Sequence, residues 1–299
     1  MNFMFVTVFV AHFAFLSIFF VNNFEKIAYA KVDFNWDHPI QGERKSVVRS
    51  FNKAKATADK VPVLMYHRIL DENQLTKAHY DERGELYGTI VTTKSFEEQM
   101  KLLNEEGYTA LTMKEFGAFM EGKLEIPKKS VLITFDDGFK DNYVNAYPAL
   151  KKNGLHATVF LITDRIDREP RDYDPKDAQY LSHADIKAGS DIFEYMSHTD
   201  KMHEKNEQGK ALLVAKDKKD ILKDLEKSMY IVGDNSAFAY PFGEYDKDTL
   251  ETLEKLDVKM AFTIKDGMAK RESEMLEIPR RGIYPSTTLD IFKNLITYE

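Results

Sequence analysis

Apolar residues of this chain fall into short continuous runs that alternate with amphipathic segments from residue 61 onward. Continuous runs, unlike alternating ones, are typical of parallel strands that are buried on both faces. Strands are predicted at residues 61–69, 108–113, 130–135, 156–163, 192–196, 237–240, 260–264 and 276–280. Helices are predicted at residues 95–106, 114–120, 141–152, 182–188, 217–231, 246–256 and 289–296.

This alternation predicts one α/β domain over residues 61–299, a distorted or incomplete (β/α) barrel. Ser95 and Glu98 form a capping-box pattern at the start of the first helix, and Gly107 follows its end. Residues 70–93 are too long for an ordinary connection and are interpreted as a functional or wandering loop. Catalytic residues of such barrels follow the carboxyl ends of the strands, which gives a test for each candidate motif.

The start of the chain has a different pattern. Residues 3–21 are almost continuously apolar and are followed by Ala28-Tyr29-Ala30. This pattern predicts a signal peptide over residues 1–30, cleaved after Ala30, and hence a secreted protein associated with the cell wall or cell surface. An uncleaved membrane anchor is the alternative. Residues 31–60 are predicted to form a basic arm, either a tether or a solvated leader.

Composition narrows the function further. The chain has no cysteine, which excludes disulfides, thiolate metal sites and a cysteine nucleophile. Its net charge of −7 gives no support to nucleic-acid binding. We expect a monomer.

Two motifs follow predicted strands. Asp136, Asp137 and Gly138 end the run at residues 130–135, where two adjacent carboxylates call for a cation unless they form a simple turn. His198 and His203 follow the run at residues 192–196. Two histidines and one carboxylate can bind a divalent metal and leave positions open for water and substrate.

These motifs resemble those of the polysaccharide deacetylases of the NodB-homology type, carbohydrate esterase family 4. The likeness rests on Thr134-Phe-Asp-Asp-Gly138, on His198-Thr with His203, and on the loop around Pro241. It implies that Asp136 is the catalytic base and that Asp137, His198 and His203 bind the metal. Zinc is the default ion, with cobalt, nickel or iron as alternatives. The backbone N–H of Phe242 is a candidate for stabilising the oxyanion.

Three departures from the family pattern stand out. The histidine pair is one residue further apart than in the common spacing. The arginine expected before Pro241 is missing, which leaves Asp136 without its usual partner. Arg280 could replace it, but a structural ion pair is the favoured interpretation. No histidine follows His203, so the family's carboxyl-terminal catalytic acid is absent.

A closed barrel offers a replacement for that acid, because its first strand lies beside its last. His67, at the end of the run Leu64-Met-Tyr-His67, is therefore the candidate acid, with a satisfied core histidine as the alternative. This arrangement resembles the family members that deacetylate poly-β-1,6-N-acetyl-D-glucosamine, a polymer of biofilms. Deacetylation of peptidoglycan or another acetylated glycan, and non-catalytic binding of a surface polysaccharide, are the alternatives.

Overall fold

The computed structural model describes residues 40, 48–51 and 56–297. The predicted signal peptide at residues 1–30 lies outside the described residues, as does most of the predicted arm at residues 31–60. In the part of the arm that is described, Arg49 binds the buried carboxylate of Glu115 with an Nη2–Oε2 distance of 2.6 Å. None of the helices in the described ranges is both long and apolar enough to span a bilayer.

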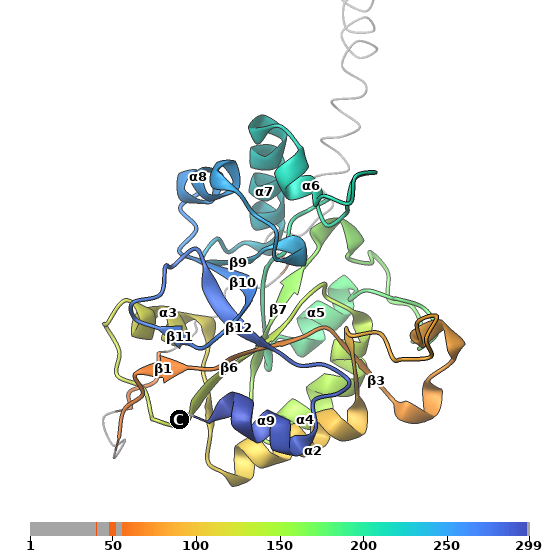
Figure 1. Ribbon diagram of the computed structural model, residues 1–299, viewed down its shortest axis with the longest axis vertical. Helices are drawn as coiled ribbons and strands as arrows, with labels where there is room; N and C mark the ends of the chain where they lie inside the picture. The colour runs from red at the N-terminus through yellow and green to blue at the C-terminus, as the bar shows by residue number, and fades with distance from the viewer. Residues whose placement is uncertain (1–39, 41–47, 52–55, 298–299) are drawn as a thin grey trace, which may run out of the picture. The chain divides into compact units, whose positions relative to one another are not determined.

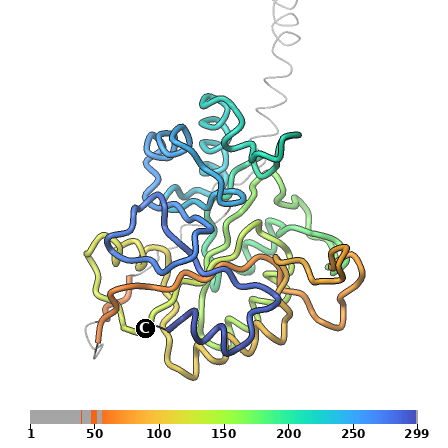
Figure 2. The backbone as a smooth tube through the Cα atoms, in the orientation of Figure 1, coloured from red at the N-terminus to blue at the C-terminus, as the bar shows by residue number. Residues whose placement is uncertain are grey.

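Seven parallel strands close into a barrel, in the order β2-β12-β10-β9-β8-β7-β6, and β6 pairs back with β2 (Figure 1). The predicted (β/α) barrel is confirmed. Figure 2 shows the orange start of the domain running beside the blue end of the chain, where Leu64 pairs with Arg281. The strands are β1 Lys60–Val61, β2 Val63–Tyr66, β3 Arg68–Leu70, β4 Ile90–Thr92, β5 Thr109–Ala110, β6 Ser130–Phe135, β7 Ala157–Leu161, β8 Phe193–Ser197, β9 Ala237–Ala239, β10 Met260–Asp266, β11 Ala269–Lys270 and β12 Ile278–Gly282.

Helices connect the strands, as the sequence pattern predicts. They are α2 Thr93–Glu105, α3 Met113–Met120, α4 Tyr147–Lys152, α5 His183–Gly189, α6 Leu212–Ala215, α7 Lys218–Val232, α8 Lys247–Lys255 and α9 Leu289–Ile296. Helix α7 has the residue pattern of an amphipathic helix. Its buried residues recur at three- and four-residue intervals, at Ile221, Leu225, Ser228 and Val232.

Several local predictions were wrong in detail. Helix α2 is capped by Thr92, whose hydroxyl accepts from the Ser95 N–H, so the Ser95 cap is wrong by one turn. The strand predicted at residues 61–69 is split into β1, β2 and β3. The helix predicted from residue 141 begins with a π-helical turn, Asn142–Ala146, before α4. The long loop at residues 70–93 contains β4, which pairs in parallel with β3.

The amino end of the barrel holds an apolar core. Val63, Ala237, Met260 and Ile278 are the first residues of β2, β9, β10 and β12, and all are buried in one hydrophobic cluster. Phe116 of α3 closes this end against Phe262, with ring centroids 5.9 Å apart. The barrel strands are parallel, so the polar groups that follow them lie at the opposite, carboxyl end.

Candidate active site

The predicted catalytic residues meet at the carboxyl end of the barrel. Strand pairing sets Tyr66 of β2 against Phe135 of β6, and the Asp136 N–H donates to the Tyr66 carbonyl at 2.9 Å. His67 and Asp136 are therefore the next residues on two neighbouring strands.

Asp137, His198 and His203 form a cluster whose ligand atoms all lie within 4.8 Å of one another. Asp137 Oδ1 lies 3.5 Å from His198 Nε2 and 3.1 Å from His203 Nε2. Atoms bound to one tetrahedral zinc ion at about 2.0–2.1 Å lie roughly 3.3 Å apart, so the spacing fits such an ion. Asp137 Oδ1 is also buried without a hydrogen-bond partner among the described residues, as expected for an oxygen that faces a cation.

The protonation of the cluster suits a metal as well. Burial lowers the pKa of His198 to about 3 and that of His203 to about 4, so both rings are neutral near pH 7. His198 Nδ1 lies 2.7 Å from the Ala239 carbonyl and must donate to it, which leaves the Nε2 lone pair free to bind a metal. Burial raises the pKa of Asp137 to about 6, and a bound cation would favour its ionised form.

The backbone is strained at three positions of this site. Asp137, Thr199 and Phe242 have φ values of 73°, 74° and 57°, in the left-handed region that residues with a β-carbon rarely adopt. The Phe242 ring packs on the His203 ring with centroids 4.6 Å apart. The two adjacent carboxylates have different partners: Asp136 binds Arg280, whereas Asp137 lies against the two histidines.

Asp136 faces an arginine that the sequence analysis had assigned to another role. Arg280 Nη1 and Nη2 bind Asp136 Oδ1 and Oδ2, both at 2.7 Å, and neither side chain reaches solvent appreciably. Burial works against ionisation of Asp136, but the Arg280 guanidinium outweighs it and holds the pKa of Asp136 well below its usual range. The favoured interpretation of Arg280 as a residue of a separate structural ion pair was therefore wrong, and the alternative, that Arg280 replaces the missing arginine, agrees with the structure. β12 lies next but one to β6 in the barrel and delivers the arginine from far along the sequence.

Comparison with known proteins agrees with this geometry. The sequence profile of the polysaccharide deacetylase family matches residues 123–261. The poly-beta-1,6-N-acetyl-D-glucosamine N-deacetylase of Staphylococcus aureus (strain MRSA252) is 31% identical over 253 residues, which cover 82% of this chain and 84% of that protein. This chain belongs to the polysaccharide deacetylase family.

Solved structures support the assignment of the fold. The Streptococcus pyogenes deacetylase PplD, solved in complex with acetate, superposes with a TM-score of 0.68 at 26% identity, over 81% of this chain and all of that one. IcaB from Ammonifex degensii superposes with a TM-score of 0.64 at 23% identity, over 81% of this chain and 99% of that one. The deacetylase described here is thus a hydrolase on the barrel of its family.

The loop that carries the two histidines of the deacetylase is held by a residue that sequence reasoning missed. Asp224 of α7 accepts the N–H of Asp200 at 2.9 Å and that of Lys201 at 2.7 Å. Asp200 in turn binds Thr163 and Lys227. A signal was available, because Asp224 is a carboxylate on the apolar face of an amphipathic helix. These bonds fix the loop that contains the extra residue between His198 and His203.

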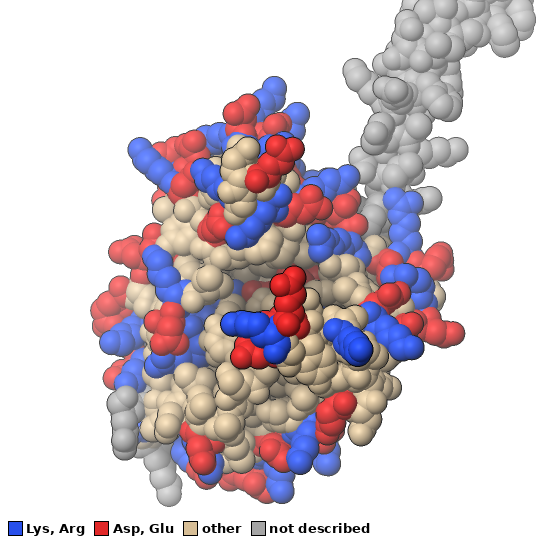
Figure 3. Space-filling model, turned by 45° about the vertical axis from the view of Figure 1, so that its right-hand side comes forward, with Lys and Arg blue, Asp and Glu red and all other residues tan. Residues whose placement is uncertain are grey.

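A small cavity of about 190 Å³ opens beside the site and is lined by Ile162, Asp164, Arg165, Asp200, Lys201, His203 and Glu204. It borders His203, a candidate metal ligand, and carries charges of both signs. Figure 3 likewise shows acidic and basic side chains interspersed over one face of the deacetylase.

Proposed function

We propose that this deacetylase hydrolyses the N-acetyl groups of poly-β-1,6-N-acetyl-D-glucosamine, releases acetate and leaves a partly cationic polymer for surface attachment in biofilms. The observation that carries the proposal is the pairing of β2 with β6, which sets the backbone of His67 beside that of Asp136. The Staphylococcus aureus relative with this substrate in its name supports the choice of polymer.

The proposed chemistry divides among the residues of the site. A divalent metal held by Asp137, His198 and His203 would activate water and polarise the acetyl carbonyl. Asp136, kept ionised and oriented by Arg280, takes a proton from the attacking water. The backbone N–H of Phe242 donates to the oxygen that gains negative charge. His67 donates a proton to the amine nitrogen as the C–N bond breaks.

An amine is a poor leaving group, so the proposed acid is essential for an amide and dispensable for an activated ester. The need for an acid in amide hydrolysis is the reason to look for one at the site, and His67 is the candidate. The imidazole is half-buried at the edge of the site, where a substrate nitrogen can approach it. A base without an arginine partner would favour the non-catalytic alternative, and Arg280 supplies that partner to Asp136.

The proposal includes export of the protein, with cleavage after Ala30 and association with the cell wall or cell surface. Fractionation of expressing cells and amino-terminal sequencing of the secreted protein test this part. A mature chain that begins at Lys31 is the expected result, and a full-length chain in the membrane fraction supports the anchor alternative.

The decisive experiment measures acetate release from β-1,6-linked and β-1,4-linked N-acetylglucosamine oligomers. Wild-type protein with added zinc is expected to prefer the β-1,6 oligomer. Asp136→Asn and His67→Ala are each expected to lower the rate by about 10² or more, as for the loss of a catalytic base or acid. Glu115→Gln, which alters a buried carboxylate at the other end of the barrel, serves as the control and should retain the wild-type rate per folded molecule.

The outcomes separate the alternatives. Preference for the β-1,4 oligomer would move the substrate to peptidoglycan- or chitin-like glycans. Binding of oligomer without acetate release, with zinc present, would favour the non-catalytic alternative. Activity that survives dialysis against a strong chelator would contradict the proposed metal dependence of the reaction.

A further inference from the structure

A polar clamp holds the backbone just after β2, where His67 lies. The Asn142 side-chain N–H donates to the His67 carbonyl at 2.7 Å. Asp141 binds the next two residues, since Oδ1 accepts the Ile69 N–H and Oδ2 accepts from Arg68 Nε, both at 2.9 Å. Asn145 donates to the Ile69 carbonyl at 2.7 Å. Three side chains of one short segment therefore fix three consecutive residues of the strand end.

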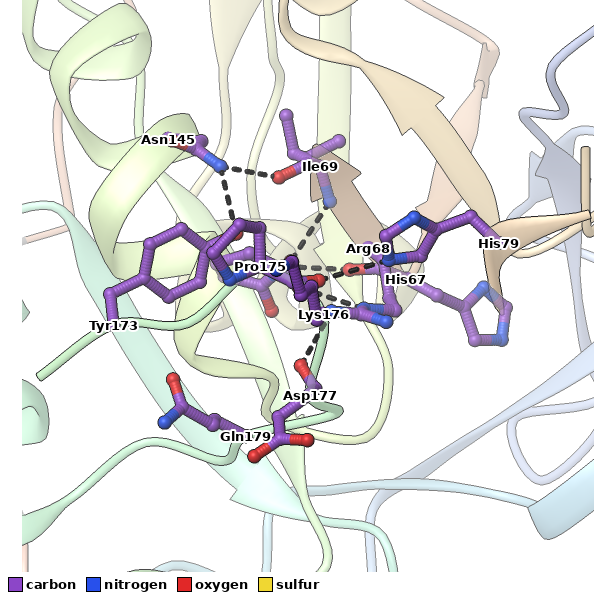
Figure 4. A network of polar contacts seen from close by, with 12 residues as sticks. His67, Arg68, Ile69, His79, Asn145, Tyr173, Pro175, Lys176, Asp177 and Gln179 are labelled. Atoms are coloured by element: carbon purple, nitrogen blue, oxygen red, sulfur yellow. Dashed lines mark hydrogen bonds and ion pairs between the residues drawn. The ribbon is translucent and has the colours of Figure 1, made fainter. Parts of the chain in front are cut away.

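The other side of the same strand end is also held. Figure 4 shows Ile69 beside Asn145, Arg68 beside the segment that carries Tyr173 to Gln179, and the His67 side chain extending to the other side of the view. Arg68 Nη2 donates to the Asp177 carbonyl at 3.1 Å, and His79 Nε2 lies 2.9 Å from the Pro175 carbonyl. The 70–93 loop and the 173–179 segment are thus tied together beside His67.

The clamp and the metal site belong to one stretch of chain. Asp136 and Asp137 directly follow β6, and Asp141 and Asn142 come within the next five residues, at the start of the π-helical turn Asn142–Ala146. π-Turns are rare and occur often at functional sites. Because this stretch is short and buried, it links the position of His67 directly to that of Asp136 and Asp137.

Asn142 itself has an unfavourable environment. Its side chain is fully buried, and its Oδ1 has no hydrogen-bond partner among the described residues. A buried amide oxygen without a partner destabilises the fold, and an apolar side chain of the same size would avoid that cost. A residue that serves packing alone would not need an amide here. The amide N–H groups donate to the His67 carbonyl at 2.7 Å and to Asp141 Oδ1 at 3.2 Å, so both bonds of Asn142 support the strand end that carries His67.

We propose that Asn142 is a positioning residue, whose amide fixes the main chain of His67 and so directs the imidazole toward the leaving nitrogen of the substrate. The inference rests on the proposed role of His67 as the acid. It assigns to Asn142 no contact with substrate or metal. Loss of the Asn142 amide should therefore affect only the step in which His67 protonates the leaving group.

The test compares two substrates on the zinc-loaded protein: an N-acetylglucosamine oligomer, with an amine leaving group, and 4-nitrophenyl acetate, whose leaving group needs no proton. Asn142→Leu is expected to lower amide hydrolysis by about 10- to 100-fold, part of the full contribution of a general acid, and ester hydrolysis by less than about 3-fold. Its melting temperature should fall only modestly, because the variant leaves the His67 carbonyl without its donor but also removes the unpaired Asn142 Oδ1. Asn145→Leu, which removes the same kind of bond two residues further along, is the matched control and should retain the wild-type ratio of amide to ester rates.

A double-mutant cycle makes the assignment sharper. If Asn142 acts through His67, adding Asn142→Leu to His67→Ala should lower amide hydrolysis no further. Equal losses on amide and ester, or a full additional loss in the His67→Ala background, would overturn the inference and leave the proposed function intact. Unchanged amide hydrolysis by His67→Ala alone would remove the acid itself and with it the role of Asn142.

Discussion

The two ends of the barrel bury different kinds of side chain. The amino end is closed by apolar side chains such as Val63, Phe116 and Phe262, each fully buried. The carboxyl end buries Asp136, Asp137 and Arg280, charged groups that are costly to remove from water. The apolar side chains at the amino end stabilise the fold, whereas the buried charged groups at the carboxyl end lower its stability and serve the proposed reaction. Substitutions should therefore separate stability from activity according to the end at which they fall.

The largest effect is expected for Arg280→Met, which leaves the buried Asp136 carboxylate unpaired. We expect a loss of about 3–5 kcal/mol in the free energy of unfolding, because a buried ion is uncompensated, together with a large fall in acetate release. Urea unfolding and rate measurements check both. The double variant Asp136→Asn/Arg280→Met should recover much of the stability and none of the activity. Wild-type stability of Arg280→Met would contradict the ion pair.

Phe116→Ala tests the amino end. The ring is fully buried against Phe262, so we expect a loss of about 3 kcal/mol or more in unfolding free energy from the lost burial and the cavity left behind. The rate per folded molecule should stay at the wild-type value. A fall in that rate, measured under conditions where the variant is folded, would show that the two ends are not independent.

Asp137→Asn should remove the stabilisation by metal without harming the metal-free fold. Wild-type protein at a zinc concentration 100 times the Kd gains about 2.7 kcal/mol, and the variant should gain little. The metal-free variant should melt no lower than metal-free wild type, because Asp137 Oδ1 is buried without a hydrogen bond. Thermal melts with zinc and with chelator check this. Glu115→Gln should lose stability and keep the zinc-induced shift.

Asp224→Asn is expected to have the smallest effect, about 1.5 kcal/mol, from one backbone N–H left without its acceptor. Burial raises the pKa of Asp224 to about 6, above its ordinary value, so the folded state binds the proton more tightly than the unfolded state. This stabilisation is complete below the unfolded pKa and is lost as the pH rises through about 6. The free-energy gap between wild type and variant should therefore narrow from pH 4 to pH 6.5, as measured by urea unfolding. A gap that widens would contradict the shift.

Much of the fold followed from local signals. The run at residues 130–135 and its Asp-Asp-Gly ending predicted β6 to the residue, because buried parallel strands are continuously apolar. Local signals did not predict the structure of the 70–93 loop. Its strand β4 has only three residues and exists because it pairs with β3, which no local pattern reports. Thr92, three residues before Ser95, competed for the same cap, and the three-dimensional path of the chain decided between them.

The metal cluster was predicted through motifs, and its supporting residues were not. Arg280 and Asp136 are 144 residues apart, so their pairing depends on barrel closure and leaves no trace in local spacing. Asn142 looks like an ordinary helix residue until its bond to the His67 carbonyl is seen. Sequence thus indicates which residues carry reactive groups, whereas their orientation depends on long-range contacts.

The barrel closes where its first strand, β2, pairs with its last strand, β12, so the site is complete only after the end of the domain has been synthesised. The proposed acid precedes most of the domain in the chain, while the arginine that orients the proposed base lies in the last strand. A chain that is still being synthesised therefore has the candidate metal ligands and Asp136 but lacks the arginine that pairs with Asp136. Contacts between distant parts of a chain form slowly, so maturation of this hydrolase should be abrupt and late. Catalysis then begins only after the final strand has closed the ring.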